Sequence, residues 1–332
     1  MSLSIGIVGL PNVGKSTLFN ALTKKTVPAE NYPFCTIDPS VGVVAVPDER
    51  LNKLSEFSKS AKTVPAAVQF TDIAGLVKGA SEGEGLGNQF LSHIRETDAI
   101  AEVVRIFEDD DIIHVNNKVD PLNDIGVINL ELILADLQTV TKRQASIGKE
   151  VKAGKKEAVI EASLLEKLAK VLKGGELASA VKVDEQETPI LKRLCLISAK
   201  PILYVLNTSE AGKNLDEIES KISGPLVKVD PIFEKGLGDL IRKSYEILNL
   251  ITFFTTGADE TRGWTIRRGS TAPEAGAAIH GDFKDKFIKA EVIEWDKLLS
   301  AGSYANAREN GLLRTEGKEY LVKDGDVIEF KV

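Results

Sequence analysis

The sequence contains few of the residues that cross-link a small secreted domain or hold a structural metal ion. Among its 332 residues there are two cysteines and three histidines, which excludes a disulfide framework and argues against structural zinc. No apolar run approaches the roughly 18 residues of a membrane-spanning helix, and the first residues carry no basic segment typical of a signal peptide. We therefore expect a protein of the reducing cytoplasm with no membrane partner.

The chain also lacks an excess of positive charge. It has 42 Lys and Arg against 49 Asp and Glu, a net charge of −7 at pH 7, so we expect no general binding to DNA. Hydrophobic residues make up 43% and charged residues 27%, which predicts a packed core rather than disorder. The length exceeds that of one ordinary domain and predicts two or three.

A phosphate-binding motif lies close to the start of the chain. Gly9-Leu-Pro-Asn-Val-Gly-Lys-Ser16 fits G-x-x-x-x-G-K-[ST], between an apolar strand expected over 3–8 and a helix expected over 16–22. This order begins a parallel α/β sheet. Backbone amides and the helix dipole would face phosphate oxygens, Lys15 would reach the β- and γ-phosphates, and Ser16 would hold Mg²⁺. We assign the phosphates to one run of residues, namely Asn12, Val13, Gly14, Lys15, Ser16 and Thr17.

Two further segments fit the metal and the γ-phosphate. Asp72-Ile-Ala-Gly75 ends an apolar strand 57 residues after Lys15, where the carboxylate can hold Mg²⁺ through water and the Gly75 amide can meet the γ-phosphate. Thr36 lies in a polar, proline-flanked loop and can close onto Mg²⁺ only when a γ-phosphate is present, which makes it a switch. We predict Ser16, Thr36 and Asp72 as metal ligands, and Lys15, Thr36 and Gly75 as catalytic groups.

Three segments have the letters of base-reading motifs. Asn117-Lys-Val-Asp120 matches the guanine-reading N-K-x-D, but a polar stretch precedes it where a buried strand should stand. Ser198-Ala-Lys200 precedes the strand that it should follow. We therefore place the base at Asn207-Thr-Ser-Glu210, which directly follows an apolar strand, with Asn207, Thr208 and Glu210 as contacts. Glu replaces the Asp that accepts from guanine, so guanine selectivity should be poor. An ordinary GTPase reading guanine through Asn117–Asp120 remains the alternative.

The middle of the chain, from about 130 to 195, has a helical composition. Apolar residues recur at helical spacing and predict two amphipathic helices that pack on each other: Leu130, Leu134, Leu137 and Val140 on one, and Leu164, Leu165, Leu168, Val171 and Leu172 on the other. Residues 141–192 hold 11 Lys and Arg against 8 Asp and Glu. This excess fits either a solvated helix pair or a basic arm for a polyanionic partner.

The last part of the chain, from about 250, is rich in short strand patterns. Residues 289–293 and 327–330 are expected to be strands, and Asp324-Gly325 has the composition of a hairpin turn. We expect a small, separate α+β domain.

Taken together, these segments resemble the YchF or Obg-like ATPase family, a branch of the Obg-type translation-factor NTPases. The matching residues are G-L-P-N-V-G-K-S, N-Y-P-F-C-T-I, D-I-A-G-L-V-K-G-A-S-E-G-E-G-L-G-N, F-E-D-D-D-I-I-H-V and N-x-x-E, followed by the block 251–332. The resemblance covers nearly the whole chain. It implies an α/β fold with a P-loop NTPase sheet over 1–128 and 196–248, an inserted α-helical coiled-coil domain over 129–195, and a β-grasp-like TGS domain over 249–332.

The resemblance also carries expectations about function. It implies binding of ATP in preference to GTP, Mg²⁺ as cofactor, a cytoplasmic location, and association with the ribosome; we expect the large subunit or its RNA as the contact, and a monomer. The family replaces the catalytic Gln after D-x-x-G by a hydrophobic residue, here Leu76, which cannot orient a water. In related NTPases K⁺ fills that role, held partly by the residue corresponding to Asn12.

One stretch departs from the family pattern. Between Asn207 and Gly236 there are fewer residues than the family predicts, and Leu226–Val229 is expected to be a short remnant of the usual strand. How the far side of the base pocket closes is left open. Two functions stay in view: a slow ATPase whose turnover does work, and a nucleotide-gated ribosome- or RNA-binding module in which hydrolysis only resets the switch.

Overall fold

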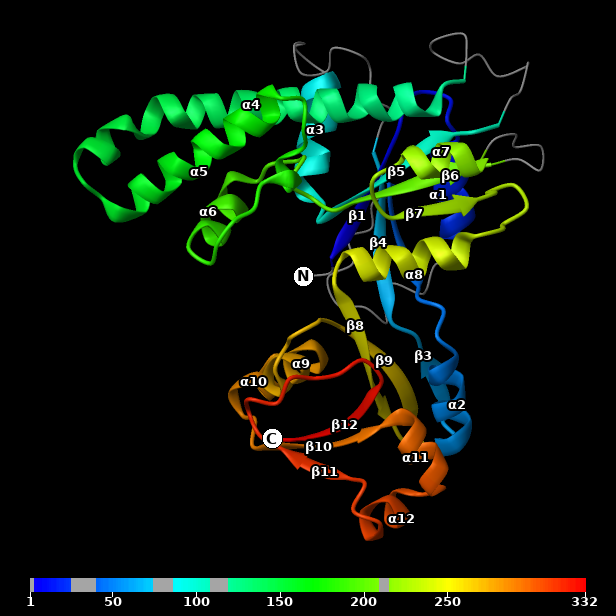
Figure 1. The fold of residues 1–332 in the computed structure, drawn as a ribbon. Coiled ribbons are helices and arrows are strands. Elements are labelled where there is room, and N and C mark those ends of the chain that lie inside the picture. The colour runs from blue at the N-terminus through cyan, green and yellow to red at the C-terminus, as the bar shows by residue number, and fades with distance from the viewer. Residues whose placement is uncertain (1–2, 25–39, 74–85, 108–118, 209–214) are drawn as a thin grey trace.

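The computed structural model describes residues 3–24, 40–73, 86–107, 119–208 and 215–332. These ranges form two six-stranded sheets and a projecting pair of long helices (Figure 1). Within these ranges, none of the helices combines the length and the hydropathy that a membrane span requires. The α/β fold class that the motifs predicted is confirmed.

The first sheet carries the P-loop. Its strand order is β2-β4-β1-β5-β6-β7, and every neighbouring pair is parallel except β2 with β4. The strands are β1 (Ser4–Val8), β2 (Val41–Ala45), β4 (Ala67–Asp72), β5 (Ala99–Arg105), β6 (Ile202–Asn207) and β7 (Leu226–Val229). β1, β5 and β6 are buried along their whole length, as expected for central strands covered on both faces.

Helices pack around this sheet and contribute to its core. They are α1 (Lys15–Thr23), α3 (Leu86–Glu96), the first half of α4 (Pro121–Lys152), α7 (Leu215–Lys221) and α8 (Leu237–Ile247). Because the strands are parallel, the carboxyl ends of β1, β4, β6 and β7 meet at one edge of the sheet. In open α/β sheets this edge is where ligands bind.

The predicted helix pair is present, but the prediction that Leu130 belongs to the apolar stripe of the first helix is wrong. The second half of α4 packs on α5 (Lys156–Lys173), with Val140, Ile147 and Leu165 in the shared core. Leu130, however, is 52% exposed. In the first half of α4, Ile128 and Leu132 pack against the first sheet. The apolar side of the helix therefore contacts the sheet in its first half and α5 in its second half. The arm is completed by a 3-10 turn (Ala178–Ala180) and α6 (Glu187–Leu194).

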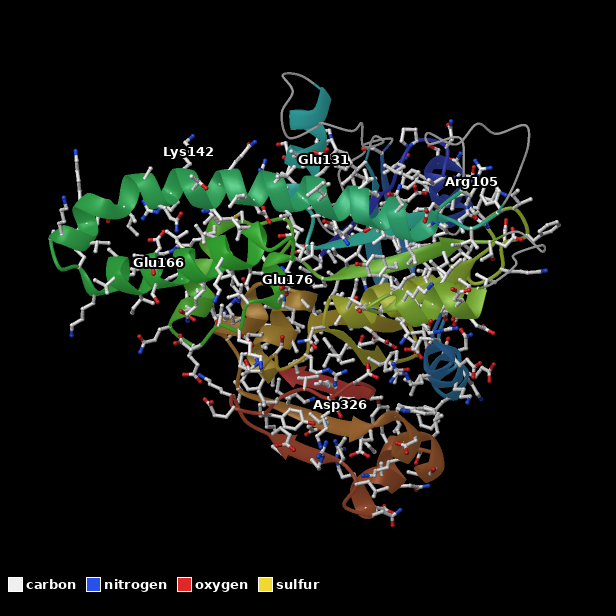
Figure 2. All side chains as sticks on the ribbon, turned by 45° about the horizontal axis from the view of Figure 1, so that its top comes forward. Arg105, Glu131, Lys142, Glu166, Glu176 and Asp326 are labelled. Atoms are coloured by element: carbon white, nitrogen blue, oxygen red, sulfur yellow. The ribbon has the colours of Figure 1, made fainter. Side chains whose placement is uncertain are left out.

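Charged side chains cover the outside of this arm. Lys142 extends from the outer side of α4 (Figure 2). Other charges pair within the arm: Arg143 Nε lies 2.6 Å from Glu161 Oε1, and Lys167 Nζ lies 2.7 Å from Glu187 Oε1. The basic excess is therefore only partly available to a partner.

The second sheet is mixed and has the order β11-β10-β12-β8-β9-β3. Its strands are β3 (Lys62–Val64), β8 (Leu250–Thr256), β9 (Glu260–Arg267), β10 (Lys289–Glu294), β11 (Arg314–Glu316) and β12 (Asp326–Lys331). Its helices are α2 (Glu49–Ser58), α9 (Ala272–Ile279), α10 (Asp282–Asp285), α11 (Trp295–Ala301) and α12 (Tyr304–Glu309). The strands predicted over 289–293 and 327–330 are confirmed.

Two features of this sheet differ from expectation. β3 pairs with β9, and Leu54 of α2 packs with Phe254 and Leu298, so residues 49–64 lie with the C-terminal sheet although they precede Asp72. The hairpin predicted at Asp324-Gly325 is wrong. β12 pairs with β10 and β8, and the left-handed Gly325 (φ 89°) only leads into the strand.

Candidate nucleotide-binding site

The predicted phosphate loop connects β1 to α1. Asn12 and Gly14 both have left-handed backbone conformations, with φ of 62° and 94°, and Gly14 is the residue that precedes α1. A Cβ atom on Gly14 would lie 2.3 Å from Nδ2 of Asn207, so glycine is required here by both conformation and space. The residues predicted for phosphate binding, from Asn12 to Thr17, thus run from the loop into the first turn of α1, whose N-terminus is suited to anions.

Lys15 is buried within this turn. Its Nζ donates hydrogen bonds to the carbonyl oxygens of Gly9 and Leu10, at 3.0 and 2.8 Å. Burial lowers the pKa of Lys15 to about 8, and the negative charge of Asp72 opposes that shift. Hydrogen bonds from an ammonium group to an anion are stronger than those to neutral carbonyls. A phosphate that replaced the two carbonyls would therefore stabilise the charged form of Lys15.

Ser16 and Asp72 are brought together beside this lysine. Asp72 ends β4, whose register places it opposite Ile7 of β1. Burial raises the pKa of Asp72, while the Lys15 charge and a hydrogen bond from the Ser16 hydroxyl lower it. A hydroxyl and a carboxylate are oxygen ligands of the kind that Mg²⁺ takes. These two residues therefore fit the predicted metal site.

Asn207 joins the predicted base site to the phosphate loop. It ends β6, is buried, and its Nδ2 donates to the Val13 carbonyl oxygen at 2.9 Å. Thr208 follows, and its amide donates to the Val229 carbonyl oxygen at 2.9 Å. The sequence predicted Asn207 as a base contact but gave no signal for its bond to Val13, because the two residues are far apart in the chain.

Several predicted residues lie outside the described residues. Thr36, Gly75 and Glu210 are among them, as are Leu76 and Asn117. The roles assigned to these residues therefore remain predictions.

The two motifs that were set aside have structural partners. Asp120 is the N-cap of α4, where its carboxylate accepts a hydrogen bond from the Asn123 amide at 3.2 Å. Lys200 Nζ donates to the carbonyl oxygens of Ile94 and Arg95, at 2.7 and 2.8 Å. Ser198 Oγ donates to Asp136 at 2.6 Å. Asp120, Ser198 and Lys200 therefore have local structural roles, and the alternative that guanine is read through Asn117–Asp120 stays a prediction.

Comparisons with known proteins agree with this geometry. Residues 4–138 match the family model MMR_HSR1, described as 50S ribosome-binding GTPase, and residues 250–332 match YchF-GTPase_C, described as a protein of unknown function (DUF933). The chain is 49% identical over 363 residues to the ribosome-binding ATPase YchF of Bacillus subtilis (strain 168), covering 100% of this chain and 99% of the relative. It is 45% identical over 359 residues to that of Escherichia coli O157:H7, covering 99% of each.

A solved structure is similar throughout. The Schizosaccharomyces pombe YchF GTPase has a TM-score of 0.88 and 38% identity, covering 99% of this chain and 98% of that one. The alignment of 363 residues with the Bacillus relative exceeds the 332 residues here, so the relative has segments that this chain lacks. Motifs, fold and full-length similarity together show that the chain belongs to the YchF family of P-loop nucleoside triphosphatases.

Proposed function

We propose that this protein hydrolyses the β–γ bond of ATP with Mg²⁺ and associates with the ribosome. The observation that supports the proposal is the buried Lys15, whose ammonium donates to two carbonyl oxygens at 3.0 and 2.8 Å and lies beside the Ser16–Asp72 pair. A triphosphate would replace those carbonyls as the partner of the ammonium.

Each residue of the site then has its own role in phosphoryl transfer. Lys15 and the loop amides from Val13 to Thr17 neutralise charge that develops on the β- and γ-phosphates. Ser16 and Thr36 would hold Mg²⁺, with Asp72 behind a water, and the Gly75 amide would sense the γ-phosphate. A Mg²⁺ ion held there would supply positive charge that offsets the charge of the phosphates.

The base is proposed to lie against Asn207, Thr208 and Glu210. The buried Asn207 amide is already oriented by Val13, and the N-x-x-E spacing lacks the Asp that would accept from guanine. Guanine selectivity should therefore be poor, and the preference for ATP over GTP is what the resemblance to the YchF family implies. The relatives named ribosome-binding ATPases support ATP as a substrate.

Hydrolysis by the protein alone is proposed to be slow. Leu76 stands where a Gln would orient the water, and K⁺ coordinated partly by Asn12 would supply the missing charge. Asn12 has a left-handed φ of 62° at the loop, an exposed position beside the phosphate site. Replacing K⁺ by Na⁺ should lower ATP turnover in the parent, and Asn12→Ala should remove that difference.

Ribosome association is supported by the names of the relatives and by the family model for 50S ribosome-binding GTPases. We propose that the exposed lysines of the α4–α5 arm face ribosomal RNA of the large subunit, and that the protein works in the cytoplasm. Two measurements separate turnover from switching. A large rise in ATP turnover with ribosomes favours an ATPase that does work, whereas unchanged turnover with ATP-dependent co-sedimentation favours a switch.

A further inference from the structure

The connection between β7 and α8, residues 230–236, is short and rigid. Asp230 and Lys235 bond to each other through both backbone amides, at 3.0 Å each. The Asp230 Oδ1 atom accepts from the amides of Ile232 and Phe233, at 3.1 Å each. At Gly236 a Cβ atom would lie 2.1 Å from the Lys228 carbonyl oxygen. The turn is thus fixed before any ligand arrives.

This turn presents two neighbouring apolar side chains to solvent. Ile232 is 77% exposed and Phe233 is 60% exposed. They are the only adjacent pair among the strongly exposed large apolar residues of the described ranges, and Phe233 is the only aromatic one. The Lys235 ammonium lies 5.4 Å from the Phe233 ring centroid, and the exposed ring can still stack with a planar ligand.

The turn begins at the predicted base site. Val229, which directly precedes it, accepts hydrogen bonds from both the amide and the hydroxyl of Thr208, at 2.9 and 3.2 Å. Figure 1 shows the turn at the edge of the first sheet where β6 also ends. Near the turn's other end, Glu234 lies 3.2 Å from Lys24, which follows the C-terminal end of α1, the end away from the phosphate loop. The start of the turn, directly after Val229, is therefore the part that lies beside Asn207 and Thr208.

We propose that Ile232 and Phe233 form the apolar wall on which the nucleobase rests, with Phe233 stacking on its ring. The proposal rests on the proposed function, because the base belongs to the nucleotide held by the phosphate loop. It gives the base pocket a wall on the side where residues 230–236 follow β7.

A stacking wall does not read the edge of a base. Every purine offers the same flat face, so Phe233 should strengthen ATP and GTP binding to the same degree, leaving their ratio to Asn207 and its neighbours. Removing one aromatic stack from a base weakens binding by roughly tenfold or more. Inorganic tripolyphosphate, which has no base, should be insensitive to the change.

The test is equilibrium binding of Mg-ATP, Mg-GTP and Mg-tripolyphosphate to the full chain and its variants. Phe233→Ala removes the ring, and Phe233→Tyr retains it. Ile288→Ala is the matched control, because Ile288 is 67% exposed and precedes β10 in the second sheet. Thermal unfolding should be the same for all variants, since the altered side chains are exposed.

We expect Phe233→Ala to weaken ATP and GTP binding alike by roughly tenfold, with tripolyphosphate binding unchanged and Phe233→Tyr close to the parent. If Phe233→Ala binds ATP as tightly as the parent, the inference about Phe233 is wrong while the proposed function stands. The same holds if Phe233→Ala loses as much affinity for tripolyphosphate as for ATP. A parent that binds neither ATP nor tripolyphosphate overturns the proposed function and this inference with it.

Discussion

The side-chain amide of Asn207 donates a hydrogen bond to the Val13 carbonyl oxygen at 2.9 Å. This bond joins the end of β6 to the phosphate loop across 194 residues of sequence. The absence of a side chain at Gly14 leaves the space that the Asn207 amide occupies. The residue predicted to contact the base is therefore bonded directly to the loop predicted to bind the phosphates.

Removing this amide should weaken nucleotide binding. Asn207→Ala loses a buried hydrogen bond and leaves the Val13 carbonyl unsatisfied, so ATP affinity should fall by about tenfold or more. Asp120→Ala is the control: it removes the N-cap of α4 and should cost about 1 kcal/mol of stability without changing the ATP-to-GTP affinity ratio. If Asp120→Ala abolishes base selectivity and Asn207→Ala does not, the base pocket is misplaced.

ATP affinity should depend on pH through Lys15. Burial lowers the pKa of Lys15 to about 8 in the free protein, and a bound triphosphate favours the charged form and raises that pKa. Affinity should therefore be constant below about pH 8 and fall above it, by at most about tenfold per pH unit. Isothermal titration across this range measures the effect. Lys15→Arg, which stays charged, should show no such fall; the same fall in that variant contradicts the assignment.

The metal site should depend on Asp72. Asp72→Asn keeps a group that can accept from the Ser16 hydroxyl but removes the negative charge, so the Mg²⁺ concentration for half-maximal ATP turnover should rise by roughly tenfold or more. Chelation of Mg²⁺ should stop turnover in the parent. Asp239→Asn, an exposed carboxylate of α8 paired with Arg242, should leave the Mg²⁺ requirement as it is. An unchanged requirement in Asp72→Asn would remove Asp72 from the site.

Stability should fall with rising pH because of Glu102. This β5 residue is 0% exposed, and neither carboxylate oxygen accepts a hydrogen bond from the described residues. Burial, and then the charge of Asp124, raises its pKa well above 4.5. The native state therefore keeps a proton that the unfolded chain releases above about pH 4.5, so stability is lost as pH rises from that value through the raised native pKa.

Glu102→Gln removes this titration without changing the shape of the side chain. Its stability relative to the parent should grow by up to about 1.4 kcal/mol per pH unit above about pH 4.5, until the native pKa is reached. Urea unfolding of both proteins between about pH 5 and pH 8 measures the difference. Parallel curves for the parent and the variant would show that Glu102 does not titrate differently on folding.

Part of the nucleotide site could be predicted from patterns of neighbouring residues in the sequence. The strand, glycine loop and helix around Lys15 are set by neighbouring residues, and an apolar run ending at Asn207 marks a buried strand with a polar end. The strand expected as a short remnant at Leu226–Val229 is present as β7. Thr36, Gly75 and Glu210 stay predictions.

Other features depend on contacts that no local pattern encodes. β3 has three residues, too few for a recognisable period, so its pairing with the C-terminal sheet could not be anticipated. Leu130 was assigned to a buried stripe because helical spacing alone does not tell which side of α4 faces the sheet and which faces α5. Glu102 sits inside an apolar strand pattern that gives no sign of how deeply its carboxyl is buried.

A crystal structure of the protein with Mg²⁺ and a non-hydrolysable ATP analogue would test the proposed nucleotide site most directly. We expect the triphosphate at the amides of Val13 to Thr17, with Lys15 Nζ moved from the Gly9 and Leu10 carbonyls to the β- and γ-phosphate oxygens and the base beside Asn207. Lys15 still bonded to those carbonyls, with the analogue bound elsewhere, would contradict it.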